Sequence, residues 1–276
     1  MYTRTELRTV PVSQHLFDIK HGGFVFHGDP AVLDLIPDQP AGELPKTCAW
    51  TLVINRLSCL LESVQESFFE TPPAGSDLLL MEYMAHKIVL CAAEALLIMR
   101  GTYDVSYARR AEAFAREFAD RPDAVELVKR STRFKLLETV ADDSDPAGLW
   151  FEARDLYLGA VTECARPRLG PRADSWTAIA GLHEGPWLGH WLRRLKWRFL
   201  DSRRHQDLLW WRRKARLEMA ELFLLVARRA GGGAHEEWLA RARDRLAPHA
   251  AGPIGSWEEV RRAAIWCERR FVHPVV

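Results

Sequence analysis

The chain has 276 residues, 48% of them hydrophobic, and its 38 Lys and Arg residues are balanced by 37 Asp and Glu residues. This length and composition exclude a wholly disordered protein and fit one large domain or two modest ones. Because the total charge is near neutral, a charged partner can only be inferred from local clusters.

Charge is unevenly distributed along the chain. Residues 31–80 hold seven acids and two bases, whereas residues 193–216 hold ten bases and two acids. Five cysteines occur without a C-x-x-C pair, and the N-terminus lacks the apolar core of a signal peptide. The longest strongly apolar run, residues 88–99, is too short to cross a bilayer. We therefore expect a cytoplasmic protein with reduced thiols and no membrane partner.

The N-terminal stretch carries the strand signals. Residues 3–12 are rich in Thr and Val and lead into a proline, which is typical of a short strand. After a glycine turn, residues 24–26 are a second strand candidate. Two short strands bury too little surface to fold alone. We expect residues 1–45 to be the remnant of an α/β domain.

From residue 46 onward the pattern is helical. Apolar residues over 48–69 recur at spacings of three and four, which predicts a helix with one buried face. Residues 78–100 predict a central helix, with Ser76 or Asp77 as its N-cap and Gly101 as its left-handed stop.

More helices are predicted after the central one, and they set the expected domains. They start at Ser106 and after Pro122, and cover about 149–164, 236–246 and 256–271. Residues 165–175 hold two prolines and a glycine and predict a loop between subdomains. The expected divisions are therefore a helical bundle over 46–165 and a second helical subdomain over 175–276.

Several motifs occur in a characteristic order. A short strand is followed by FDIKHGG and FVFHGD, then by Asn55-Arg56 inside an apolar helix, a central helix ending in RGTY, and a helix that begins S-Y-x-x-R. This order resembles the second half of DNA polymerase β-like nucleotidyltransferases. It is most similar to those with a C-terminal helical bundle, as in antibiotic nucleotidyltransferases and the related HEPN domains. The resemblance covers roughly residues 4–118.

The resemblance implies a chemistry that this chain only partly carries. Such enzymes bind a nucleoside triphosphate through a Gly-Ser turn and hold two Mg²⁺ ions with an Asp-x-Asp pair and a third carboxylate. The turn and the pair are expected upstream of residue 1 and are absent. Glu6 matches the third carboxylate, a catalytic residue and metal ligand that would project from a strand; the alternative is a solvent-facing strand residue without such a role. The resemblance therefore implies a catalytically incomplete protein, whose missing core comes from an upstream stretch, a partner chain or a second protomer.

Two short motifs resemble the missing parts but have simpler interpretations. Residues 75–77 spell Gly-Ser-Asp without a preceding strand, so we interpret them as a helix cap. Residues 143–145 spell Asp-Ser-Asp before a proline, so we interpret them as a surface turn.

The central helix carries a polar seam. Tyr83, Lys87, Cys91 and Glu94 recur on one side of it. Glu94 lies between alanines and needs a partner if it is buried, either Lys87 or an arginine from another helix. One interpretation is an ion pair between helices. The other is a seam that binds substrate, with Lys87 contacting phosphate and Glu94 beside it.

The basic aromatic segment 189–216 combines four tryptophans with its bases. Arginines beside stackable rings can hold phosphates and unstacked bases, which makes Arg212 and Arg213 candidate phosphate ligands in an RNA or polyanion-binding module. The same pattern is typical of an amphipathic helix that covers a core.

HEPN-type ribonucleases carry an Arg that is followed, after four to six residues, by a His. Two places in this chain resemble that motif. Arg198 with His205, and Arg243 with His249, show a comparable spacing, which arises easily by chance among 38 basic residues and ten histidines. No zinc spacing, Walker loop or G-x-S-x-G elbow occurs.

The prediction is a mainly α protein with a short N-terminal strand-containing remnant. Its expected function is that of the substrate-side helical part of a nucleotidyltransferase-like protein, with Mg²⁺ and a nucleoside triphosphate as cofactors if the missing core is supplied. The alternatives are a helical RNA or polyanion-binding module and a HEPN-type ribonuclease.

Overall fold

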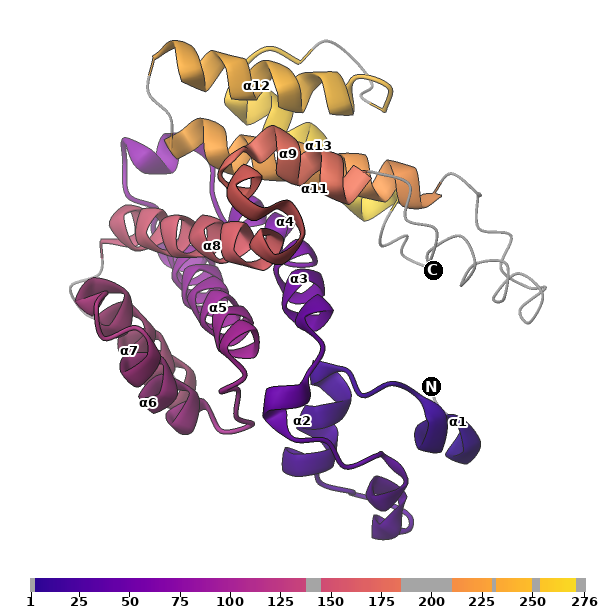
Figure 1. Cartoon of the computed structure of the whole chain (residues 1–276). Helices are drawn as coiled ribbons and strands as arrows, with labels where there is room; N and C mark the ends of the chain where they lie inside the picture. The colour runs from indigo at the N-terminus through magenta and orange to yellow at the C-terminus, as the bar shows by residue number, and fades with distance from the viewer. Residues whose placement is uncertain (1–2, 138–144, 185–209, 230–231, 250–253, 272–276) are drawn as a thin grey trace. The chain divides into compact units, whose positions relative to one another are not determined.

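The computed structural model describes residues 3–137, 145–184, 210–229, 232–249 and 254–271 (Figure 1). These residues are mainly helical and contain no β-strand, which confirms the predicted mainly α class. The chain divides into two compact units. The N-terminal unit comprises residues 1–63 and 67–167, and the C-terminal unit comprises residues 64–66 and 168–276. The predicted remnant, residues 1–45, lies in the N-terminal unit together with the bundle that follows it.

The N-terminal unit is built from α-helices joined by short 3₁₀-helices. The α-helices are α1 (Arg4–Thr9), α2 (Gln14–Gly22), α3 (Lys46–Ile54), α4 (Leu57–Glu62), α5 (Gly75–Arg100), α6 (Tyr107–Glu117), α7 (Pro122–Leu137) and α8 (Pro146–Leu169). The 3₁₀-helices are η1 (Pro30–Leu35), η2 (Ala41–Glu43) and η3 (Glu66–Phe69).

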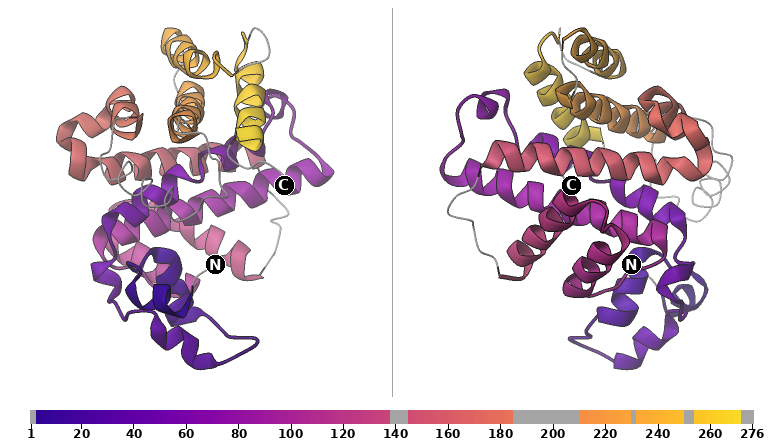
Figure 2. Two further views of the ribbon diagram at one scale, coloured as in Figure 1. Left: turned by 90° about the vertical axis from the view of Figure 1, so that its right-hand side faces the viewer. Right: turned by 60° about the vertical axis from the view of Figure 1, so that its left-hand side comes forward.

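Helix α5 is the central element of this unit. It packs against α3, α4, α6 and α7, and α6 and α7 lie side by side along it (Figure 2). Most of its residues from Met81 to Ile98 are buried, because apolar residues occupy nearly its whole circumference. Helix α8 is fixed to α3 and α4 by two aromatic side chains: the Trp150 indole donates to the Leu60 carbonyl at 3.0 Å, and the Tyr157 hydroxyl donates to the Val53 carbonyl.

The end of α5 is closed by two devices. Gly101 has φ 75°, a left-handed conformation that glycine adopts without strain, which confirms the predicted stop. In addition, the Lys46 ammonium, at the start of α3, donates to the carbonyls of Ile98 and Met99 at 2.8 and 2.6 Å. A cation at a helix C-terminus satisfies free carbonyls and opposes the negative end of the helix dipole.

Helix starts agree with the sequence in part. Ser106 caps α6, its hydroxyl accepting from the Arg109 amide at 3.5 Å, and α7 begins at Pro122 as predicted. The predicted N-cap of α5 is wrong: the helix already begins at Gly75, after Ala74, and Asp77 lies in its first turn.

The predicted N-terminal strands are wrong. Residues 4–9 form α1, because Thr3 and Glu6 make a capping box: the Thr3 hydroxyl accepts from the Glu6 amide, and the Glu6 carboxylate accepts from the Thr3 amide at 2.7 Å. Residues 24–26 are also not a strand, and the side chains of Phe24 and Phe26 are 77% and 94% exposed. The strand from which Glu6 was expected to project is therefore not present among the described residues.

The predicted loop over residues 165–175 is also wrong. Helix α8 continues to Leu169 with Pro167 inside it, and the 3₁₀-helix η4 (Gly170–Asp174) follows directly. Pro167 lies in the last turn of α8, where it removes one backbone donor without interrupting the helix further.

The C-terminal unit consists of η4, α9 (Trp176–Glu184), α11 (Trp210–Arg229), α12 (Gly233–Leu246) and α13 (Trp257–Phe271). Helix α11 is its core and contacts α9, α12 and α13. A hydrogen bond joins His183 to Glu218 at 2.8 Å, and an ion pair joins Arg245 to Glu184 at 2.6 Å.

Candidate functional site

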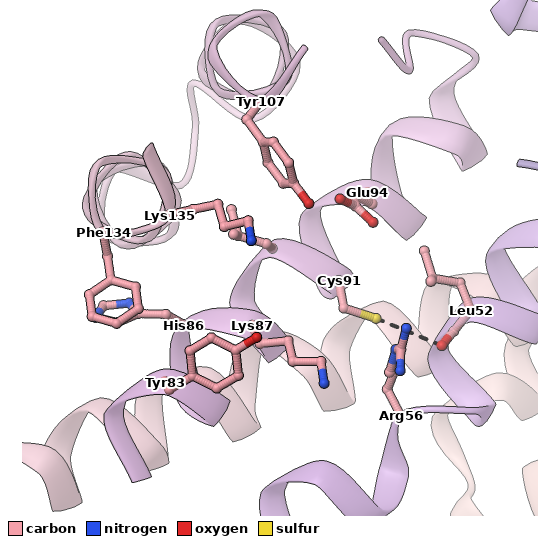
Figure 3. A pocket seen from close by; sticks show the side chains of 11 residues that line it. Leu52, Arg56, Tyr83, His86, Lys87, Cys91, Glu94, Tyr107, Phe134 and Lys135 are labelled. Carbon is pink, nitrogen blue, oxygen red and sulfur yellow. Dashed lines mark hydrogen bonds between the residues drawn. The ribbon is translucent and has the colours of Figure 1, made fainter. Parts of the chain in front are cut away.

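A cavity of about 170 Å³ opens on the side of α5 in the N-terminal unit (Figure 3). Helix α5 supplies the largest share of its lining, including all four residues of the predicted seam. Other side chains come from the α3–α4 junction, the first turn of α6 and the end of α7. We call this cavity the cation pocket, for the positively charged residues Arg56, Lys87 and Lys135 that line it.

The three cations come from different elements. Lys87 projects from the middle of α5, Lys135 from the end of α7, and Arg56 is the N-cap residue of α4. None of the three forms an ion pair with a carboxylate in the described part of the chain. Three positive charges that form no ion pair among the described residues create a local positive potential, which attracts anions.

Each lysine of the pocket lies near an aromatic ring. The Lys87 ammonium is 6.0 Å from the centre of the Tyr83 ring, and the Lys135 ammonium is 6.0 Å from the centre of the Tyr107 ring. At this distance the attraction between cation and ring is weak, so the ammonium groups can still bind a ligand. Tyr83 is 46% exposed and stands at the rim of the pocket.

Glu94 is the one carboxylate among the described residues that line the pocket, and Arg110 neutralises it. The Glu94 and Arg110 side chains are only 12% and 8% exposed and are in direct hydrogen-bond contact. Burial raises the pKa of Glu94, and the Arg110 guanidinium opposes this rise. Of the two partners that the sequence suggested for Glu94, the structure therefore has the arginine from another helix.

Arg110 is held from several directions. Its guanidinium lies between the rings of Tyr103 and Tyr107, 4.5 and 4.6 Å from their centres. It also donates to the backbone carbonyls of Asp104 at 2.5 Å and Val105 at 3.2 Å. Because one residue supports both Tyr107 and Glu94, Arg110 determines the shape of one wall of the pocket.

Two further lining residues are uncharged at neutral pH. Burial lowers the pKa of His86 to about 4, and its Nδ1 is 2.9 Å from the Ser131 hydroxyl while its ring stacks on Phe134. Burial raises the pKa of the Cys91 thiol well above its ordinary value, and Cys91 Sγ lies 3.7 Å from the Leu52 carbonyl. Neither a cationic imidazole nor a thiolate is therefore expected here.

The other predicted site residues do not join the pocket. Glu6 is exposed on α1 and is engaged in its capping box. Arg212 and Arg213 belong to α11 in the C-terminal unit; the side chain of Arg212 lies outside the described residues, and that of Arg213 is half-buried. Of the Asp-Ser-Asp motif, only Asp145 is described, and its carboxylate accepts from the Gly148 amide at 2.9 Å.

The Arg–His pairs are only partly described. Arg198 and His205 lie outside the described residues. Arg243 donates to the carbonyl of Gly255 and pairs with Glu236 at 3.7 Å. Burial and nearby arginines lower the pKa of His249.

The residues present do not fit a two-magnesium site. Within the described ranges, no three His, Cys, Asp or Glu side chains are grouped so that they could hold a metal ion. Glu6 has both of its capping contacts on its own first turn. The described side chains therefore offer no ligand set for a pair of Mg²⁺ ions.

The lining residues that were not among the predicted site residues include Arg56, Tyr107 and Lys135. Arg56 and Tyr107 belong to motifs that carried the family resemblance, so a signal for them existed. Lys135 gave none, because the apolar pattern of α7 predicts a buried face but not which helix it packs against.

No protein-family model, curated protein or solved structure matches this chain. In the part of the chain that the structure describes, none of the helices combines the length and the apolar character that crossing a membrane requires.

Proposed function

We propose that the cation pocket binds the phosphate end of a nucleoside phosphate, and that the N-terminal unit is the substrate-side helical part of a nucleotidyltransferase-like protein. The observation that carries the proposal is the convergence of Arg56, Lys87 and Lys135 on one cavity: among the described residues none of the three forms an ion pair, and the lining carboxylate Glu94 is paired with Arg110.

The arrangement of charge favours a polyvalent anion. A guanidinium can bind two oxygens of one phosphate side by side, and ammonium groups bind phosphate oxygens as point charges. With Glu94 neutralised by Arg110, the three cations leave an excess of positive charge at the pocket. A single carboxylate would balance only one of them, whereas a di- or triphosphate balances all three.

The dimensions favour partial burial of the ligand. A volume of about 170 Å³ is below the roughly 300 Å³ at which pockets for small molecules begin. The cavity therefore accommodates phosphate groups and leaves the rest of the ligand outside. The exposed ring of Tyr83 at the rim offers a surface on which a base can stack.

The chemistry of transfer must come from elsewhere. The described residues provide no metal cluster, so an Asp-x-Asp pair and its Mg²⁺ ions would come from an upstream stretch, a partner chain or a second protomer. In this proposal the chain contributes substrate binding, and Glu6 is given no role.

Titration with ATP tests the proposal. Lys87→Gln and Lys135→Gln should each weaken ATP binding about tenfold or more, since a charge-assisted hydrogen bond contributes about 1.5–3 kcal/mol. Lys129→Gln is the matched control, because Lys129 is exposed on α7 but does not line the pocket. The proposal fails if the wild-type protein does not bind ATP, or if Lys129→Gln weakens binding as much as Lys135→Gln.

The two alternatives stay predictions from sequence. RNA binding through Arg212 and Arg213 would weaken steeply with salt and with Arg212→Glu/Arg213→Glu. Ribonuclease activity would be lost in His205→Ala or His249→Ala. The described residues contain no contact that favours either alternative over the cation pocket.

A further inference from the structure

Glu94, Arg110 and Asp18 form a triad of two acids and one base, and Glu94 lines the cation pocket. Arg110 contacts Glu94 directly, and its second terminal nitrogen lies 3.5 Å from a carboxylate oxygen of Asp18 on α2. The Asp18 side chain is 31% exposed, so it is more accessible than the other two. One positive charge serves two carboxylates, and one negative charge is left without a match when both are ionised.

The remaining contacts of Asp18 are neutral. The Tyr103 hydroxyl donates to its two oxygens at 2.8 and 3.1 Å, and the Gln14 amide donates to it at 2.5 Å and to the Tyr103 hydroxyl at 2.8 Å. These donors stabilise the carboxylate without cancelling its charge. Burial raises the pKa of Asp18 as well as that of Glu94.

Other titratable and charged groups surround the triad from each element packed on it. They are His15 on α2, Arg56 at the start of α4, His86, Lys87 and Cys91 on α5, Tyr103 before α6, Tyr107 on α6 and Lys135 on α7. Since His86 has a pKa of about 4 and burial holds the Cys91 proton, neither changes charge between pH 5 and 8. His15 acts electrostatically on Asp18, so its effect must be separated experimentally from that of the carboxylates.

We propose that a proton is a co-ligand of the cation pocket: an anion that enters beside Glu94 binds together with one proton, which the Asp18–Glu94 pair takes up around Arg110. This inference rests on the proposed function, since it concerns anions in the same pocket. The physical reason is repulsion, because the incoming anion adds negative charge next to a carboxylate pair that already lacks one counter-ion.

The proposal fixes the sign of the pH dependence. The free protein loses the shared proton at a lower pH than the complex does, since bound anion favours the protonated carboxyl. Between these two pH values each binding event takes up one proton, and the affinity falls by up to about tenfold for each unit that the pH rises. Below this range the affinity does not change with pH.

Sulfate is the suitable probe, because it remains a dianion from pH 5 to 8 whereas phosphate esters change charge there. Calorimetric titration of sulfate in pairs of buffers with different ionisation enthalpies counts the protons directly. The wild type should take up close to one proton per sulfate at a pH midway between the two values at which the free protein and the complex lose the shared proton. Glu94→Gln should bind sulfate with an affinity that does not fall as the pH rises.

Two further variants separate the triad from its surroundings. Asp18→Asn leaves Arg110 with one acid, so proton uptake should be lost while sulfate still binds. His15→Gln should keep the proton uptake of the wild type. Circular dichroism reports whether each variant is folded. If Glu94→Gln does not fold, the proton uptake of Asp18→Asn, which changes the most accessible residue of the triad, tests the proposal.

The outcomes distinguish this inference from the proposed function. Sulfate and ATP binding with no proton uptake by the wild type overturns the inference and leaves the proposed function standing. Proton uptake that persists in Asp18→Asn and disappears in His15→Gln also overturns it. If neither sulfate nor ATP binds at any pH, both proposals are wrong.

Discussion

Replacing Arg110 by methionine tests the buried triad through stability, independently of any ligand. Methionine keeps an unbranched, flexible apolar stem and removes the guanidinium with its charge. The variant leaves Glu94 and Asp18 without their counter-ion and the carbonyls of Asp104 and Val105 without a donor. Because Glu94 is buried, hydration does not compensate for the loss of its counter-ion.

The size of the effect follows from the burial of the pair. With Arg110 and Glu94 side chains 8% and 12% exposed, the value for a buried pair applies, not the value of about 0–1 kcal/mol for a surface pair. Removing one partner of a buried ion pair costs about 3–5 kcal/mol. Arg110→Met should therefore destabilise the N-terminal unit by this amount at pH 7.

The pH dependence of this loss has a definite sign. Burial raises the pKa values of Glu94 and Asp18, so protonation stabilises the folded state, and this contribution fades as the pH rises through the folded pKa values. Loss of Arg110 raises both pKa values further. The destabilisation should therefore be smaller at pH 4.5 than at pH 7, where the buried Glu94 and the partly buried Asp18 have both lost their ion-pair partner.

Hydrogen exchange of the α5 and α6 amides measures this loss within the N-terminal unit itself. The double variant Arg110→Met/Glu94→Gln should recover part of the lost stability, because it no longer buries the Glu94 charge. A cost below about 1 kcal/mol at pH 7, or strictly additive effects in the double variant, would refute the reasoning.

Two other predictions concern stability. Gly101→Ala should lower the free energy of unfolding by about 1–2 kcal/mol, because φ is 75° and a Cβ would lie 3.3 Å from the Gly42 Cα. The control Gly159→Ala, inside α8 with open space around it, should not destabilise the protein. Equal unfolding midpoints for the two variants would contradict this. His86 has its pKa lowered from 6.5 to about 4, so the unfolded chain takes up a proton that the folded chain does not, and stability should fall by up to about 3 kcal/mol from pH 6.5 to pH 4. In urea unfolding across this range, His86→Gln should show a shallower decline, and parallel curves would show that His86 is not responsible.

The helices with strong periodicity were predictable from the sequence. Apolar spacing and Gly101 gave the central helix and its end, and Ser106 and Pro122 marked the starts of the next two. Each of these signals is local, because a cap or stop is satisfied within one turn of its own helix.

The strand prediction for the N-terminus was wrong because it gave more weight to the residue composition than to the capping residues. Thr and Val favour strands, but Thr3 and Glu6 have the three-residue spacing of a capping box, and this contact forms without a partner strand. A strand depends on hydrogen bonds to a neighbour, and the described residues provide none.

The candidate site was predictable on one helix only. Spacing along α5 placed Lys87 and Glu94 on the same side, and the structure brings both to one cavity. The positions of Lys135 and Arg110 opposite them depend on how α6 and α7 pack on α5. This packing depends on the shapes of whole helix faces, which periodicity does not specify.

The contact between Lys46 and the last turn of α5 has a consequence for biosynthesis. Lys46 is translated more than fifty residues before the carbonyls of Ile98 and Met99 to which it donates. When the ribosome releases the end of α5, the group that closes this end has already left the exit tunnel, together with the whole of α3. The central helix can therefore be completed on its α3 neighbour during translation, before α6 and α7 have left the exit tunnel.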